Sequence, residues 1–301
     1  MLNSSRRSPL HYGRLGSLEE RLNVSSAPQR GASLHLRRRA GLGVGLKIMI
    51  MNKQSFFLVA AVVLLSACGA REETKFLNAN PEAVVITSDG KATNGMECRV
   101  GEQYVYLDHI LYRISGSNMV VAGYETTMAA SVTIVPYIVF KGTEYKVTKI
   151  GQGAFKSNKI LNSIELPKTL EEIEDEAFRQ CKTLRTINLP DATKTIGEWA
   201  FGTCEGLTSV TFGKKLETLR EAAFWNTAIT SVSLPSTVKT IESMAFGSCD
   251  NLRMMRVAMT TPPSDSGLGT NKSNVTLYIP SGTYDAYYAI YSWRCKQIIE
   301  E

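Results

Sequence analysis

The dipeptide Ala-Phe recurs at a nearly constant interval through the second half of the chain. Successive copies are 23, 23, 23 and 22 residues apart, and they begin at Ala154, Ala177, Ala200, Ala223 and Ala245. A unit of this length is too small to bury its own apolar side chains. Stacked units bury them together, because each column of like residues joins one continuous core. The interval therefore predicts a solenoid in which every unit adds one turn.

Other apolar positions keep a fixed offset from each Ala-Phe pair. An Ile or Leu stands four residues before each Ala, and the second unit continues after its Phe with Cys181, Leu184, Ile187 and Leu189. The two apolar side chains of the Ile-x-Leu stretch face one way, which is typical of a short strand. We expect stacked copies of this strand to form a parallel sheet. The Ala-Phe segment is expected to form the other wall as a short helix or 3₁₀ turn, with Phe as the large core residue.

The complete pattern resembles a known repeat. Written as I-x-x-x-A-F-x-x-C-x-x-L-x-x-I-x-L-P, it is similar to the BspA-like (type 5) leucine-rich repeat of bacterial surface proteins, and the close match covers residues 147–258. The resemblance implies an α/β leucine-rich-repeat solenoid of about five 23-residue repeats. It also implies a non-enzymatic binding or adhesion module, with a protein or a glycan as ligand.

The segment before the repeats, residues 81–146, predicts a cap of β-hairpins. Ile110, Tyr112 and Ile114 alternate with other residues, and a turn over 115–118 precedes a second apolar stretch. Similar β segments open the solenoid in the resembled family. Such a cap would cover the open core of the first repeat.

The segment after the repeats, residues 259–301, predicts a cap made of a strand and a helix. We expect the strand over 275–280 and the helix over 282–292, an order that resembles the terminal segment of the same family. Tyr284, Tyr287 and Tyr291 fall on one face of that helix. An aromatic stripe can bind carbohydrate, but packing in the core is the interpretation that we adopt.

An export signal occupies residues 49–67. Its apolar stretch, Phe56–Leu65, has ten residues, whereas a helix that spans a bilayer needs about twenty. The stretch runs into Leu65-Ser66-Ala67-Cys68, which resembles the lipobox of bacterial lipoproteins. The resemblance implies cleavage before Cys68, attachment of acyl chains such as palmitate to it, and a tether over 68–80. A plain secretory signal followed by a chance Cys is the alternative.

The predicted location is the outer membrane, with the protein held by its lipid. Three acyl chains anchor a protein far more firmly than one. The acidic pair Glu72-Glu73 resembles the surface-export signal of some Gram-negative anaerobes, so we expect the cell-surface side, with the periplasmic side as the alternative. Residues 1–48 show neither helical nor strand period. They are either an unstructured extension upstream of a true start at Met49 or Met51, or a basic targeting arm.

The positive charge of the chain is concentrated at its beginning. The net charge is +6, and residues 1–50 hold nine Lys or Arg and two acids, which leaves −1 for the remainder. Binding to nucleic acid needs a basic patch on the folded part. No nucleic-acid partner is therefore expected.

No set of residues with catalytic or metal-binding spacing is visible. After the export signal the chain has one His, His109, which lies beside Asp108 in an expected hairpin turn. Neither H-E-x-x-H nor G-x-S-x-G occurs. We therefore predict a protein that is not an enzyme and that needs neither a metal nor a cofactor.

Three cysteines hold the same position in the repeat. Cys181, Cys204 and Cys249 each follow a Phe by three residues. A column of this kind does not converge on one point as a zinc site requires, and parallel Cβ vectors suit a disulfide poorly. We expect buried free thiols in the core. Cys98 and Cys295 are either unpaired or paired with each other.

The polar residues of each Ile-x-Leu strand predict a surface. They alternate with the apolar pair, so they should face outward and repeat at about 5 Å per turn. We name them the ladder: Ser163, Glu165, Thr186, Asn188, Ser209, Thr211, Ser231, Ser233 and Arg256, with Met254 beside the last. They are either ordinary exposed strand residues or a surface for an extended glycan or peptide. In the second case, Glu165 and Arg256 at the two ends could orient a polar ligand.

Two functions remain in competition at this point. The first is a membrane-anchored surface lipoprotein that binds a protein or glycan ligand. The second is an accessory subunit that docks to another outer-membrane component, such as a complex for glycan uptake.

Overall fold

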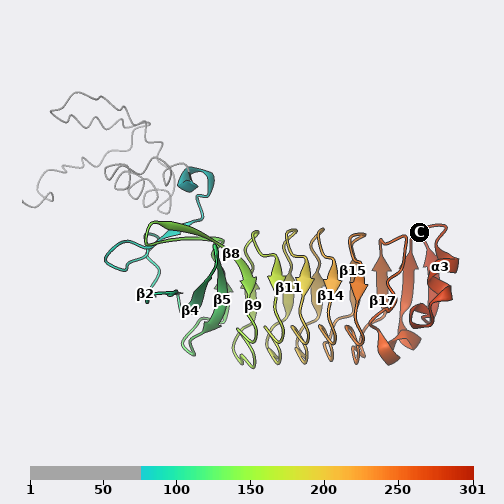
Figure 1. Ribbon diagram of the computed structural model, residues 1–301. Helices are drawn as coiled ribbons and strands as arrows, with labels where there is room; N and C mark the ends of the chain where they lie inside the picture. The colour runs from blue at the N-terminus through green and yellow to red at the C-terminus, as the bar shows by residue number, and fades with distance from the viewer. Residues whose placement is uncertain (1–75) are drawn as a thin grey trace, which may run out of the picture. The chain divides into compact units, whose positions relative to one another are not determined.

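The computed structural model describes residues 76–301 (Figure 1). The predicted export signal, Cys68 and the basic segment 1–48 lie outside the described residues. Within the described part, the repeats stack side by side into a solenoid with a β-sheet cap before them and a strand-and-helix cap after them. This is the predicted leucine-rich-repeat architecture. Among the described helices, none combines the length and the apolar character needed to cross a membrane.

One wall of the solenoid is built from the predicted Ile-x-Leu strands. The pairs within it are parallel, as predicted, but they form three short sheets, β6-β9, β11-β13 and β15-β17-β18-β19, in place of the single sheet expected. In chain order the strands are β6 (Ser131–Thr133), β9 (Ser163–Glu165), β11 (Thr186–Asn188), β13 (Ser209–Thr211), β15 (Ser231–Leu234), β17 (Met254–Val257), β18 (Thr276–Ile279) and β19 (Gln297–Glu300). The wall therefore extends beyond the Ala-Phe units at both ends, through β6 on one side and through β18 and β19 on the other.

A second wall consists of two-residue parallel strands that contain the Ile or Leu before each Ala-Phe pair. These strands are β10 (Glu172–Ile173), β12 (Thr195–Ile196), β14 (Thr218–Leu219) and β16 (Thr240–Ile241). The sequence marked the apolar column but did not predict a strand there, because two residues are too few to show an alternating pattern. Each of these strands adds one rung to a sheet that begins in the cap.

The amino-terminal cap continues the second wall without interruption. Its sheet runs from β2 through β3, β4, β5 and β8 directly into β10. The bounds of the cap strands are Val84–Val85 (β1), Cys98–Val100 (β2), Tyr104–Leu107 (β3), Ile110–Ser115 (β4), Asn118–Tyr124 (β5), Tyr137–Phe140 (β7) and Thr143–Ile150 (β8). The predicted hairpin with its turn after Ser115 is β4 and β5. Hydrogen bonds from the cap therefore close the open edge of the first repeat.

The Ala-Phe segments are consecutive turns, so the prediction of a short helix or 3₁₀ turn is wrong. Each turn has two residues at positive φ, for example Trp199 (54°) and Thr203 (57°). A right-handed helix cannot pass through such residues. Their N–H groups instead donate to the next repeat, Trp199 to the carbonyl of Glu221 (3.0 Å) and Thr203 to that of Trp225 (2.7 Å). The backbone bonds of this wall therefore run between repeats.

The Phe residues of the repeats form a stack through the core. Phe155, Phe178, Phe201, Phe224 and Phe246 are fully buried. Neighbouring ring centroids lie 5.0–5.6 Å apart, and their planes differ by 3–7°. The cap extends the stack, because Tyr124 of β5 lies parallel to Phe155 at 5.8 Å. The predicted core role of Phe is confirmed, and the contribution of Tyr124 is new.

The three repeat cysteines are buried and free. Each thiol also donates a hydrogen bond to a Phe carbonyl of an earlier repeat, at 3.0 Å for Cys181 and Cys204 and at 3.1 Å for Cys249. The amide of Asn271 continues the series by donating to the Phe246 carbonyl at 2.7 Å. Each of these three cysteines thus ties its own turn to an earlier one, a role that the sequence pattern did not reveal. Burial raises the pKa of the Cys249 thiol.

The carboxyl-terminal cap contains η2 (Gly269–Asn274), α3 (Tyr284–Ala289) and η3 (Tyr291–Trp293) besides β18 and β19. Tyr287 is buried and its hydroxyl donates to the Met259 carbonyl at 2.6 Å. Tyr284 and Tyr291 are 41% and 72% exposed, so the prediction that all three tyrosines pack in the core is wrong. The helix ends at Ala289, and Ile290 has an extended backbone. The helical spacing therefore does not continue to Tyr291, and its side chain does not lie on the same face as Tyr287.

Candidate binding surface

The ladder lies on the outer side of the first wall. In β11 and β13 the central residue is buried and its two neighbours are exposed. The register places Thr186 beside Ser209 and Asn188 beside Thr211. In the same way β15 and β17 align their outward residues, and Met254 is 36% exposed. Alternation along each strand and parallel pairing between strands thus align the ladder side chains in two rows.

The middle of the ladder has no internal partners. Among residues 76–301, no side-chain hydrogen bond or ion pair engages Thr186, Asn188, Ser209, Thr211, Ser231 or Ser233. These hydroxyls and the amide carry donors and acceptors toward solvent. Because the side chains are short, fixing them against a ligand costs little conformational entropy. The central ladder is therefore chemically able to hydrogen-bond an extended polar ligand.

The ends of the ladder are engaged within the protein. Glu165 accepts a hydrogen bond from Thr133 at 3.1 Å, and Ser163 donates to Ser131 at 2.8 Å. Arg256 donates two hydrogen bonds to Glu301, at 2.8 and 2.9 Å. The charge of Arg256 is thus compensated within the protein, which weakens the idea that it orients a ligand, whereas Glu165 has a hydrogen-bond partner but no counter-ion among residues 76–301.

Outward residues of β6 and β18 belong to the same rows and were missed by the sequence reasoning. Ser131 and Thr133 of β6 align with Ser163 and Glu165, and Thr276 and Tyr278 of β18 align with Met254 and Arg256. Strands β6 and β18 have no Ala-Phe pair in front of them. Their own apolar alternation is the only signal in the sequence that could have located them.

The second wall differs because its charges pair with one another. Glu171 contacts Lys146 at 3.3 Å and Lys194 at 3.0 Å, so one carboxylate joins three turns. Hydrogen bonds from Lys194 and Lys146 hold the pKa of Glu171 below its ordinary value. Lys239 contacts Glu217 at 2.7 Å in the same manner. This wall satisfies its own charges, whereas the central ladder leaves its polar groups free.

His109 lies in the turn between β3 and β4, as predicted. It and Asp108 have φ values of 65° and 47°, which a two-residue hairpin turn requires. Its ring lies 3.1 Å from Glu125 and 3.0 Å from Thr127. Throughout the described part of the chain, no cluster of three or more His, Cys, Asp or Glu is arranged to hold a metal ion.

Comparison with known proteins gives the family of the repeats. Residues 135–253 match the BspA type leucine-rich repeat region in six copies, one more than the five Ala-Phe units. Repeats of this type occur in surface-associated proteins that bind other proteins. No protein of curated function matches the chain.

Several solved structures are similar to this chain. A leucine-rich repeat protein from Bacteroides ovatus is 27% identical over 58% of this chain and 49% of its own, with a TM-score of 0.49. This chain therefore spans about half the length of that protein. The T. pallidum leucine-rich repeat protein is 24% identical over 49% of this chain and 68% of its own, with a TM-score of 0.43. The pneumococcal vaccine antigen PcpA is 13% identical over 67% of this chain and 99% of its own, with a TM-score of 0.31. By their sequence, residues 135–253 are a BspA-type leucine-rich repeat region.

Proposed function

We propose that this protein is a cell-surface lipoprotein whose solenoid binds a protein or glycan ligand along the central ladder and catalyses no reaction. The observation that supports this most strongly is the contrast between the two walls. Six adjacent outward side chains of the ladder make no hydrogen bond or ion pair within the described region, while the second wall pairs its charges. A surface held ready for a ligand needs free polar groups on a rigid support.

The ladder suits an extended ligand better than a compact one. Its hydroxyls recur at the spacing of parallel strands, about 4.8 Å. A glycan or an extended peptide presents hydrogen-bonding groups at comparable intervals along its length. Several weak hydrogen bonds formed in register then add up, although each one contributes only about 0.5–1.5 kcal/mol.

The binding test compares matched charge substitutions on the two walls. Thr186→Lys combined with Thr211→Lys places two long cations on the ladder, and Thr195→Lys combined with Thr240→Lys does the same on the second wall. Both pairs should leave unfolding nearly unchanged, because exposed substitutions usually shift stability by less than about 0.5 kcal/mol. We expect the ladder pair alone to lose adhesion of expressing cells to immobilised matrix proteins or glycans.

Two outcomes of that comparison contradict the proposal. Equal adhesion by both variants would place the ligand site elsewhere. Crosslinking on intact cells that recovers outer-membrane proteins, and no matrix protein or glycan, would favour the accessory-subunit function instead.

Anchoring is tested at Cys68. If this residue carries the lipid, Cys68→Ala abolishes incorporation of a fatty-acid analogue and releases the protein from the membrane fraction. Three acyl chains supply far more membrane affinity than any surface contact of the repeats could replace. Protease accessibility on intact cells separates the cell-surface side of the outer membrane from the periplasmic side. Equal labelling of the variant and the original protein would show that Cys68 is not the acylated residue.

A further inference from the structure

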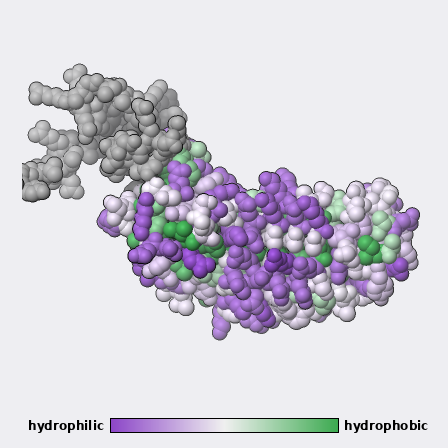
Figure 2. Space-filling view, in the orientation of Figure 1, coloured by the Kyte–Doolittle hydropathy of each residue, from purple (hydrophilic) through white to green (hydrophobic). Residues whose placement is uncertain are grey.

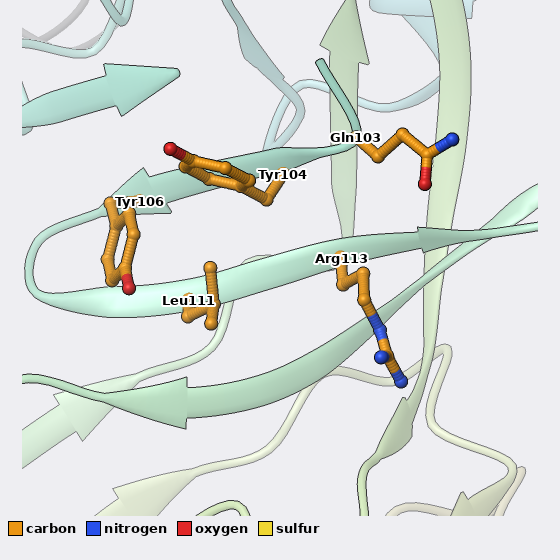
Figure 3. A pocket seen from close by; sticks show the side chains of 5 residues that line it. All are labelled: Gln103, Tyr104, Tyr106, Leu111 and Arg113. Atoms are coloured by element: carbon orange, nitrogen blue, oxygen red, sulfur yellow. The ribbon is translucent and has the colours of Figure 1, made fainter. Parts of the chain in front are cut away.

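The outer face of the amino-terminal cap carries a cavity of about 440 Å³. It is lined by Gln103, Tyr104, Tyr106, Leu111 and Arg113, which come from β3, β4 and the residue before β3 (Figure 3). The strand register places Tyr104 opposite Arg113 and Tyr106 opposite Leu111. It is an open hollow on the sheet surface, so a ligand there would lie against the sheet with one side facing solvent. It lies on a different sheet from the ladder.

This face is uncovered although it carries large side chains. The alternate residues of the same strands, such as Val105 and Tyr112, are buried in the core. On the outer face, Tyr104 is 42% exposed, and Tyr106 and Leu111 are partly exposed. Figure 2 shows hydrophobic residues in places over the cap and over the carboxyl-terminal end, while hydrophilic residues predominate over the repeats. An exposed apolar patch with a polar rim is typical of a binding site.

The two aromatic rings are held in place before any ligand arrives. The Tyr104 ring lies against Gly101, where an added Cβ would come within 2.3 Å of it. Tyr106 packs edge-to-face on Tyr104, with centroids 5.7 Å apart. The guanidinium of Arg99 lies 4.7 Å from the Tyr106 ring centroid, and Arg99 is itself paired with Glu125. Rings that are fixed in this way lose little entropy on binding.

Arg113 is the charged group of the cavity. It is exposed, and nothing in residues 76–301 gives its guanidinium a hydrogen bond or an acidic partner. A guanidinium binds a carboxylate through two parallel hydrogen bonds. The cavity therefore combines aromatic rings, which pack against apolar C–H faces, with one uncompensated positive charge.

We propose that this cavity binds an acidic sugar residue, of the uronic or sialic acid class, within a glycan. The Tyr rings receive the C–H face of the sugar, Arg113 binds its carboxylate, and Gln103 hydrogen-bonds a hydroxyl. An extended peptide fits this face less well, because β3 and β4 are both paired on either side and offer no free strand edge. The site is independent of the ladder, so a failure at either site leaves the other untouched.

The test measures binding of sialyllactose, an oligogalacturonate and neutral lactose to the purified full chain by calorimetry. We expect either or both acidic glycans to bind and lactose to bind at least about tenfold more weakly, since a hydrogen bond to a charged group is lost. Arg113→Gln keeps a polar side chain but removes the charge, and it should erase the preference for acidic glycans. Arg185→Gln, at an exposed arginine in the repeats, is the matched control and should change nothing.

A second variant separates ring position from charge. Gly101→Ala leaves Arg113 and both rings in the chain but displaces the Tyr104 ring, so it should weaken binding of the acidic glycan severalfold with no change in thermal unfolding. Equal binding of acidic and neutral glycans, unchanged preference in Arg113→Gln, or binding of an acidic peptide in place of any glycan would overturn the proposal. Absence of glycan binding by the folded protein would overturn it as well.

Discussion

At the scale of single residues, the turns of the solenoid place unfavourable side chains at positive φ. The first turn uses Gly153 at one of the two positions, but later turns place Glu176, Trp199, Ala222 and Met244 there. A left-handed conformation costs an L-residue about 1–2 kcal/mol. The left-handed conformation directs each of these N–H groups toward the next repeat, as in the hydrogen bond from the Glu176 N–H to the Glu198 carbonyl (2.8 Å). The hydrogen bonds between repeats therefore offset the local backbone strain.

Thr203 is the residue at which this strain can be relieved. It is β-branched and has a φ of 57°, whereas the equivalent position in the next turn is Asn226 at 53°. Asn tolerates this region far better than a β-branched residue. Thr203→Asn should therefore raise the free energy of unfolding by roughly 0.5–1 kcal/mol in urea melts. Thr211→Asn, in strand β13, is the control and should lower the free energy of unfolding slightly. If the two substitutions shift the free energy of unfolding in the same direction and by the same amount, the backbone at Thr203 is not strained.

At the scale of elements, the Phe stack links the repeats mechanically and energetically. Phe201 lies in the middle, 5.0 Å from both Phe178 and Phe224. Phe201→Ala should lower the free energy of unfolding by about 3–5 kcal/mol, the usual range for truncation of a buried Phe. Phe212 is half-buried and packs edge-on against Phe224, so Phe212→Ala should cost clearly less. Urea melts that rank the two variants equally would contradict a stack that carries the core.

Some of these elements were predictable from the sequence and others were not, for physical reasons. A column such as that of Phe201 or Cys204 is visible because stacking imposes the same environment on every unit. The turn conformation at Trp199 was not predictable, because its N–H donates to a carbonyl in another repeat. Such a contact produces no pattern in the local sequence. The two-residue strands around Ile173 and Ile196 were too short to alternate. At the cap, spacing alone assigned Tyr291 to the buried helix face, because the sequence does not mark the helix end at Ala289.

The same limits apply to the candidate sites. The outward direction of the ladder residues followed from strand alternation, and Thr186 and Ser209 are exposed; their role in binding stays a prediction. The engagement of Arg256 by Glu301 was not predictable, because 45 residues separate them and only the fold brings β17 near the chain end. The cavity around Tyr104 and Arg113 depends on pairing between β3 and β4 and on the close approach of a ring to Gly101. Neither contact has a periodic signal in the sequence.

At the scale of the whole described solenoid, charge is distributed unequally between the walls. The second wall joins its turns through carboxylates that face lysines of neighbouring turns, such as Glu171 with Lys146 and Lys194. The first wall joins some of its turns through strand hydrogen bonds, as between β11 and β13, and leaves its central side chains neutral. One wall is therefore sensitive to pH and salt, and the other is free to take up a ligand without a large electrostatic change.

The stability of the solenoid should consequently fall in acid. Hydrogen bonds from lysines hold the pKa of Glu171 and of Glu217 below their ordinary value of 4.5. A carboxylate whose pKa is depressed by folding stabilises the folded state above its ordinary pKa, and this contribution disappears as the pH falls through the depressed value. The urea concentration at the unfolding midpoint should therefore stay constant near neutral pH and fall when the pH is lowered below about 4.5.

Glu171→Gln should make part of that fall smaller and should start from a slightly lower midpoint at pH 7. Added salt should reduce the difference in midpoint between the variant and the original protein at pH 7, because exposed ion pairs are screened. Glu198→Gln, at an exposed acid that forms no ion pair within residues 76–301, should follow the original curve; a Glu171→Gln curve that also follows it would show that these pairs do not join the turns energetically.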